Sequence, residues 1–92
     1  MAYYLAIGSS WNGTTGKQWW NRKAGKFQPY RCMNCVYPTY RGAARLFGSY
    51  KSAPFMAWQE AIDQSDASDK VTFWLLSQET VEKWDQEEKI AA

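Results

Sequence analysis

The amino-acid sequence predicts an α+β fold: a small single domain in which an antiparallel sheet of about four strands is covered by two helices. Residues 3–9 form a short apolar run that ends in Gly and Ser, which is typical of a strand. Residues 70–76 form a β-branched and aromatic run that is apolar on both faces, which indicates a central strand covered on each side. Two further segments repeat apolar residues at helical spacing.

A hairpin is predicted in the first half of the chain. Its arms are Lys17 to Arg22 and Lys26 to Arg31, and Lys23-Ala24-Gly25 lies between them. Because proline cannot donate to a strand ladder, Pro29 restricts the second arm to an edge of the sheet. Residues 11–16 contain Asn-Gly and a second glycine, which predicts a turn before the hairpin.

The helical segments lie in the second half. Gly42 to Phe47 predicts one or two helical turns, and Pro54 suits the first turn of a clearer helix, because its missing N–H has no partner there. We expect that helix to end at residues 66–69 and to present on one face Phe55, Trp58 and Ile62. Ser77 caps a last helix, whose narrow apolar stripe is Val81 and Trp84.

Charge divides the chain into two parts. With 92 residues it forms one domain at most, with a basic, aromatic part at 1–59 and an acidic helix-strand-helix part at 60–92. The first part contains eight cations and no carboxylate, whereas the second contains nine carboxylates and three lysines. Such asymmetry predicts contact with nucleic acid or another polyanion. The alternative is that the acidic part folds back and neutralises the basic part.

The inventory of reactive side chains predicts a protein that is not an enzyme. The sequence contains no histidine, which removes the usual general base and the usual metal ligand. Asp63, Asp66 and Asp69 stand at three-residue steps, which is more typical of a polar helix end than of a cation site. We therefore expect no catalytic residue, no cofactor, no metal site and no small-molecule substrate.

The segment Cys32-Met33-Asn34-Cys35 is the one recognisable short motif. It supplies half of a zinc site, and a dimer would be needed to complete four-cysteine coordination. A redox role would place the pair at the start of a helix that follows a strand, but the next residues, Val36-Tyr37-Pro38, indicate a loop. The motif therefore predicts two packed thiols.

Cations and rings alternate along the basic part, and this pattern supplies the candidate binding residues. Lys and Arg neutralise phosphates, and exposed rings stack on unpaired bases. If Trp19 and Trp20 lie in a strand, one indole faces the core and the other faces solvent. The candidate residues for binding nucleic acid or another partner are Lys17, Trp19, Arg22, Lys23, Lys26, Tyr30, Arg31, Tyr40, Arg41, Arg45 and Lys51.

Two hypotheses of function follow from this pattern. The first is a small binding protein whose basic, aromatic face engages RNA, DNA or a nucleoprotein complex. The second is a protein-only inhibitor or adaptor, in which exposed Trp, Tyr and Arg side chains anchor a host protein. Imitation of DNA by the acidic last helix is less favoured, because three lysines accompany the nine carboxylates of that part.

In its size, aromatic bias, lack of catalytic residues and solitary domain, the chain resembles the small phage-encoded proteins that block bacterial defences, such as anti-CRISPR proteins. The resemblance covers the whole chain and rests on no shared motif, so it assigns a role to no residue. It implies stoichiometric inhibition of an RNA-guided (CRISPR–Cas) complex by blocking its binding to target DNA. Since no segment has the length of a membrane span or the layout of a signal peptide, we expect a cytoplasmic protein, in the host cytoplasm if phage-encoded.

Overall fold

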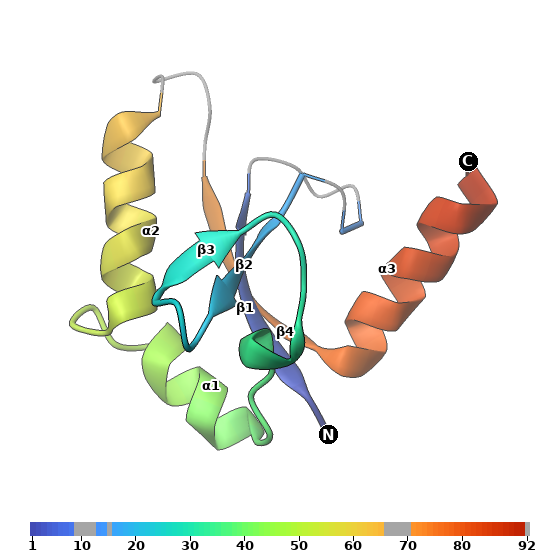
Figure 1. The fold of residues 1–92 in the computed structure, drawn as a ribbon, viewed down its shortest axis with the longest axis horizontal. Helices are drawn as coiled ribbons and strands as arrows, with labels where there is room; N and C mark the ends of the chain where they lie inside the picture. Colours follow the sequence, from blue (N-terminus) through green and yellow to red (C-terminus); the bar gives the residue numbers. More distant parts are fainter. Residues whose placement is uncertain (9–12, 15, 66–70, 92) are drawn as a thin grey trace.

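A four-stranded antiparallel sheet forms the centre of the computed structural model, which describes residues 1–8, 13–14, 16–65 and 71–91. The strands lie in the order β3-β2-β1-β4 (Figure 1). Their bounds are Tyr3–Gly8 for β1, Gln18–Asn21 for β2, Lys26–Gln28 for β3 and Thr72–Ser77 for β4. Strand β3 ends one residue before Pro29 and lies at an edge, as the missing N–H of proline predicts.

Helices cover both faces of this sheet. Helices α1 (Tyr40–Phe47) and α2 (Ala53–Gln64) lie on one side, and α3 (Gln78–Ala91) lies on the other (Figure 1). A single 3-10 turn, η1 (Met33–Cys35), packs on the same side as α3. The sheet is thus the middle of three layers, and each of its faces contributes to a separate apolar core.

Alternation along the strands divides the side chains between the two cores. Ala6 of β1 lies between Trp19 of β2 and Trp74 of β4 in the register, and these side chains face α3 and η1. The opposite face carries residues that pack against α1 and α2, among them Leu5 and Trp20. Because neighbouring residues of a strand point to opposite faces, the adjacent indoles of Trp19 and Trp20 both enter a core.

Short polar side chains begin each α-helix. The hydroxyl of Thr39 accepts a hydrogen bond from the backbone N–H of Gly42 at the start of α1, at 3.1 Å. Ser52 accepts in the same way from Phe55, and Ser77 from Thr80. These hydroxyls satisfy backbone donors that have no partner inside the helix.

The structure confirms the predicted α+β fold and its four antiparallel strands, with three differences in detail. The segment 42–47 belongs to a third full helix, α1, which begins at Tyr40. Strand β4 is an edge strand, so its prediction as central was wrong. Helices bury both of its faces, and among the described strands β1 alone pairs with it. The prediction that one of Trp19 and Trp20 faces solvent was also wrong.

Some predictions concern residues on which the structure gives no description. The turn at 11–16 is described only at residues 13, 14 and 16, and the break at 66–69 lies outside the described ranges. Within the described ranges, no helix combines the length and the apolar character needed to cross a membrane.

Candidate nucleic-acid interface

Lys17 is buried, which corrects its prediction as a surface cation. Its side chain is 2% exposed, and its Nζ lies 4.5 Å from the centre of the Trp74 ring and 4.8 Å from that of Trp84. The ammonium also donates a hydrogen bond to the carbonyl oxygen of Gly13. Burial lowers the pKa of Lys17, and the nearby Glu88 carboxylate opposes this shift. Lys17 therefore belongs to the packing between the sheet and α3.

Trp19 is also unavailable to a partner, because it is 2% exposed beneath η1 and α3. Its ring meets that of Tyr4 edge to face, with centroids 5.7 Å apart. The guanidinium of Arg31 lies over the indole, 5.0 Å from its centre. The prediction that Trp19 stacks on bases was thus wrong, because the layer formed by η1 and α3 covers its side chain.

Arg31 is neutralised by the acidic part of the chain. Its Nη2 lies 2.6 Å from Oδ2 of Asp85 on α3, and both side chains are partly buried. The alternative in which acidic residues fold back on basic ones thus holds for this cation. Arg31 and Lys17 both pack on the α3 side of the sheet.

Three exposed cations lie at the β2–β3 hairpin turn: Arg22 and Lys23 in the turn itself, and Lys26 as the first residue of β3. Because the strands are antiparallel, this turn lies at the end of the sheet where β1 begins. Arg22 is held in place there. Its Nη1 donates to the carbonyl of Val36 at 2.9 Å, and its guanidinium lies 4.5 Å from the centre of the Tyr37 ring. The turn thus presents its cations from a fixed backbone.

Two tyrosine contacts tie helix α1 to the same end of the sheet. The backbones of Tyr37 and Tyr3 exchange two hydrogen bonds, of 2.8 and 2.9 Å, beside the first residue of β1. The rings of Tyr3 and Tyr40 meet edge to face at 5.6 Å. The ring of Tyr37 stacks on Arg22 of the hairpin turn, and α1 starts three residues later, at Tyr40. The first turn of α1 therefore lies close to the hairpin turn.

Helix α1 adds a second group of cations, Arg41 and Arg45, which lie one helical turn apart on the same side. Lys51 follows in the connection to α2, and all three side chains are exposed. We call the whole surface the basic end. Its members are Arg22, Lys23, Lys26, Tyr40, Arg41, Arg45 and Lys51.

The cations of the basic end have no acidic partner in the described part of the chain. Residues 1–59 contain no carboxylate, and the ion pair found between described residues joins Arg31 to Asp85 instead. Arg41 and Arg45 repel each other at about 0.2–0.5 kcal/mol, as like charges one turn apart do. Arg41 also stands in the first turn of α1, where the helix dipole disfavours a cation. Arg45 lies in the last turn, where the same dipole favours a cation, so the electrostatic cost within α1 falls on Arg41.

The hairpin turn and η1 enclose a shallow hollow that sequence reasoning missed. It is lined by Arg22, Lys23, Met33 and Asn34 and has a volume of about 340 Å³. Met33 is 85% exposed, an unusual position for a thioether. Nothing in the sequence indicated this, because the hollow depends on a long-range hydrogen bond from the backbone N–H of Arg22 to the carbonyl of Asn34, at 2.8 Å.

Tyr30 and Tyr40, the predicted stacking tyrosines, are both well exposed, at 63% and 59%. Tyr40 belongs to the basic end by its place on α1. Tyr30 lies four residues beyond Lys26, past the far end of β3, and we leave it out of the surface.

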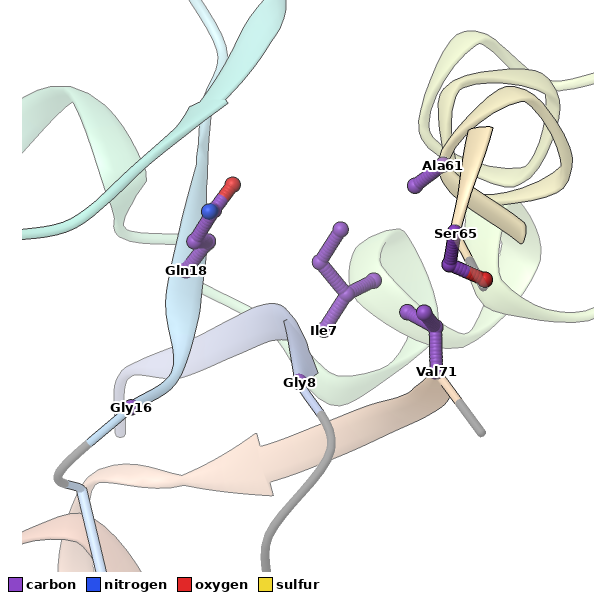
Figure 2. Close-up of a pocket in the computed structure, with 7 residues that line it drawn as sticks. All are labelled: Ile7, Gly8, Gly16, Gln18, Ala61, Ser65 and Val71. Carbon is purple, nitrogen blue, oxygen red and sulfur yellow. The ribbon is translucent and has the colours of Figure 1, made fainter. Parts of the chain in front are cut away.

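A separate cavity of about 240 Å³ opens at the opposite end of the sheet (Figure 2). Figure 2 shows the side chains of Ile7, Ala61 and Val71 around it. Its seven lining residues carry no ionisable side chain, so they supply no acid, base or charge for chemistry. The candidate site is therefore the basic end.

Comparisons of this chain with family models, curated proteins and solved structures found no significant match. The class that the fold and site define is a small α+β domain with a concentrated cationic surface at one end. Its function must be inferred from that surface.

Proposed function

We propose that this protein binds single-stranded nucleic acid, free or as part of a nucleoprotein, through the basic end. The observation that carries the proposal is the gathering of six exposed cations from two separate chain segments, with no carboxylate paired to them among the described residues. Long charged side chains at a protein surface usually alternate in sign, whereas this surface keeps one sign.

Phosphate groups are the natural complement of such a surface. Each Lys or Arg that neutralises a phosphate releases condensed counterions, which favours binding at low salt. The hairpin turn and the first turn of α1 offer cations on both sides of Tyr37, whose ring already stacks on a guanidinium. A nucleic-acid strand that lies along this surface would meet positive charges along its length.

Tyr40 supplies the ring that a single strand requires and a duplex does not. It is 59% exposed at the start of α1, next to Arg41. Stacking of an unpaired base on an exposed ring contributes about 1–3 kcal/mol and demands no particular sequence. We therefore expect little preference for base sequence and a preference for single strands over duplexes.

The electrostatic cost within α1 supports the same conclusion. Arg41 stands in the first turn of a helix that has no acidic residue there, where the dipole disfavours a cation, and Arg45 repels it from one turn away. An anionic partner relieves this repulsion on binding, so the same arrangement that costs stability adds affinity.

Fluorescence anisotropy with labelled single-stranded RNA and DNA tests the proposal. We expect Arg45→Glu to weaken binding by roughly fivefold or more at low salt, because it removes one cation and adds a repulsive charge. Lys83→Glu is the matched control, since Lys83 is an exposed cation on α3, the helix that lies across the sheet from α1 (Figure 1). Absence of binding to either strand at low salt, or equal losses for both variants, would contradict the proposal.

A protein-only partner is the second candidate, and exposed apolar side chains favour it. Tyr50 is 71% exposed and Met33 is 85% exposed, and both neighbour cations of the basic end. Aromatic, Met and Arg side chains are enriched in protein interfaces. In that case the largest losses would come from Tyr40→Ala or Tyr50→Ala, and nucleic acid would not compete with the partner.

The resemblance to phage-encoded inhibitors adds a more specific version of the proposal. In that version the basic end docks on the guide RNA or displaces a DNA strand in an RNA-guided complex, and target DNA is excluded. A reconstituted effector complex that still binds its target DNA in excess of this protein would contradict that version, while leaving direct strand binding testable as above.

A further inference from the structure

The two cysteines lie close together on a preformed turn. Cys32 is the residue that caps η1 and Cys35 is its last residue, and the backbone N–H of Cys35 donates to the carbonyl of Cys32 at 2.9 Å. Their Sγ atoms are 3.9 Å apart. A disulfide bond is about 2.0 Å long, so rotation of the side chains on this turn needs to close a gap of about 2 Å.

A buried amide points at both sulfurs. The Nε2 of Gln28 lies 3.4 Å from each Sγ, and Gln28 is only 6% exposed. One hydrogen of this Nε2 is donated to the carbonyl oxygen of Tyr30 at 2.9 Å, which leaves the other for a sulfur, and a neutral thiol is a weak acceptor. A thiolate accepts hydrogen bonds far more strongly, so the arrangement stabilises the ionised form of a cysteine.

A chain of hydrogen bonds fixes which end of that amide faces the sulfurs. The Oε1 of Gln28 accepts from Nδ2 of Asn21 at 2.9 Å. The Oδ1 of Asn21 in turn accepts from the backbone N–H groups of Lys23 and Ala24, at 3.0 and 2.9 Å. Because backbone N–H groups can only donate, both amides have one satisfactory orientation, and it aims a donor of Gln28 at the cysteines.

The two thiols differ in access to solvent. Cys35 is fully buried, whereas Cys32 lines an open hollow of about 410 Å³ between η1 and α3. A backbone hydrogen bond from Asn34, followed by the one from Gln28, lowers the pKa of Cys32, and burial raises the pKa of Cys35. One thiol is thus partly exposed and has a lowered pKa, and its neighbour is buried.

We propose that Cys32 and Cys35 form a redox-active dithiol, in which Cys32 attacks an external disulfide and Cys35 resolves the product. The thiolate of Cys32 bonds to one sulfur of a disulfide R–S–S–R and expels the other as R–S⁻, which takes up the proton lost by Cys32. Cys35 then loses its proton and attacks Sγ of Cys32, which releases the second R–SH. Two protein thiols are oxidised to one disulfide, and one external disulfide is reduced to two thiols.

This inference stands apart from the proposed nucleic-acid binding, because it uses the α3 side of the hairpin and no cation of the basic end. It assigns a reactivity to the two packed thiols that the sequence predicts. The residues that favour an ionised thiol are Gln28 and Asn21. Their roles depend on side-chain geometry that the Cys-x-x-Cys spacing does not reveal.

Intact-mass spectrometry of the reduced protein after incubation with glutathione disulfide tests the proposal. We expect the wild type to lose two hydrogen atoms and to regain them with dithiothreitol, and Cys35→Ser to keep one glutathione as a stable mixed disulfide. Cys32→Ser is expected to react at least roughly tenfold more slowly, because its remaining thiol is buried. A wild type that stays reduced, or a Cys32→Ser variant that reacts as fast as Cys35→Ser, would overturn the proposal.

A second measurement addresses the positioning role of Gln28. We expect Gln28→Leu to slow alkylation of Cys32 by iodoacetamide several-fold at neutral pH, while Gln59→Leu, at an exposed position of α2, leaves the rate unchanged. In urea all variants should react alike, so the difference reports the folded structure. Equal rates for folded Gln28→Leu and wild type would show that the amide does not activate the thiol. If Gln28→Leu does not fold, the two cysteine variants still decide the question.

Discussion

Lys17 lies against Trp74, with its ammonium 4.5 Å from the centre of the indole ring and its side chain 2% exposed. Trp84 of α3 lies on the same ammonium at 4.8 Å, so the cation stands where the sheet and the last helix meet. A charge in this position interacts with the negative faces of the two rings and loses its water. This side chain therefore contributes to the stability of the α3 layer, together with the core residues Val81 and Trp84.

Reversal of the charge at Lys17 should be among the most destabilising changes of a basic residue in this protein. We expect Lys17→Glu to lower the free energy of unfolding by about 3 kcal/mol, since it buries an unpaired carboxylate near Glu88. Lys23→Glu is the control at an exposed position and should change stability by about 0.5 kcal/mol or less. Urea unfolding followed by tryptophan fluorescence measures the free energy of unfolding of both variants. Equal losses in the two variants would mean that Lys17 is exposed to solvent.

The pH dependence of stability should carry the signature of the same residue. Since burial lowers the pKa of Lys17 below its ordinary 10.5, the folded state disfavours the proton that the unfolded state binds. The cost to the free energy of unfolding is full below the pKa of Lys17 in the folded state. It disappears as the pH rises to the pKa of Lys17 in the unfolded state. The wild type should therefore gain stability relative to Lys17→Met between these two pH values. A difference that is independent of pH up to 10.5 would contradict the lowered pKa.

Removal of the carboxylate of Asp85 should affect stability more than binding. Asp85 accepts from Arg31 at 2.6 Å and from the hydroxyl of Thr14 at 2.9 Å, so Asp85→Asn weakens two contacts that fasten α3. We expect a loss of about 1 kcal/mol, in line with partly exposed ion pairs. Affinity for a single strand should change less than about twofold, because Arg31 lies outside the basic end. Glu82→Gln, an exposed neighbour on α3, serves as the control for net charge. A large rise in affinity with Asp85→Asn alone would mean that Arg31 is a masked binding residue.

The elements of the fold could be predicted from local patterns, but their neighbours could not. The hairpin followed from two arms on either side of the Lys-Ala-Gly turn, with Pro29 placing the second arm at an edge. The last helix followed from Ser77 and the stripe of Val81 and Trp84. Strand β4 was assigned a central place because both of its faces are apolar. Helical layers can bury two faces without a second neighbouring strand, so composition could not determine the order of the strands.

The candidate site was only partly predictable, because charge can be read from the sequence whereas contacts between distant segments cannot. Charge alone identified the six cations of the basic end, because residues 1–59 offer no acid to pair with them. It failed for Lys17 and Arg31, whose partners Trp84 and Asp85 lie more than fifty residues away on α3. Such contacts depend on how the last helix crosses the sheet, which no short segment of the sequence encodes.

The salt dependence of binding tests the central claim most directly. If the basic end neutralises phosphates with its six cations, the logarithm of affinity for a single strand should fall with the logarithm of salt concentration at a slope of about −4. Arg41→Ala combined with Arg45→Ala should make that slope shallower by about 1.4, while Lys83→Ala leaves it unchanged. A slope near zero, or one that the paired substitution does not alter, would contradict the account.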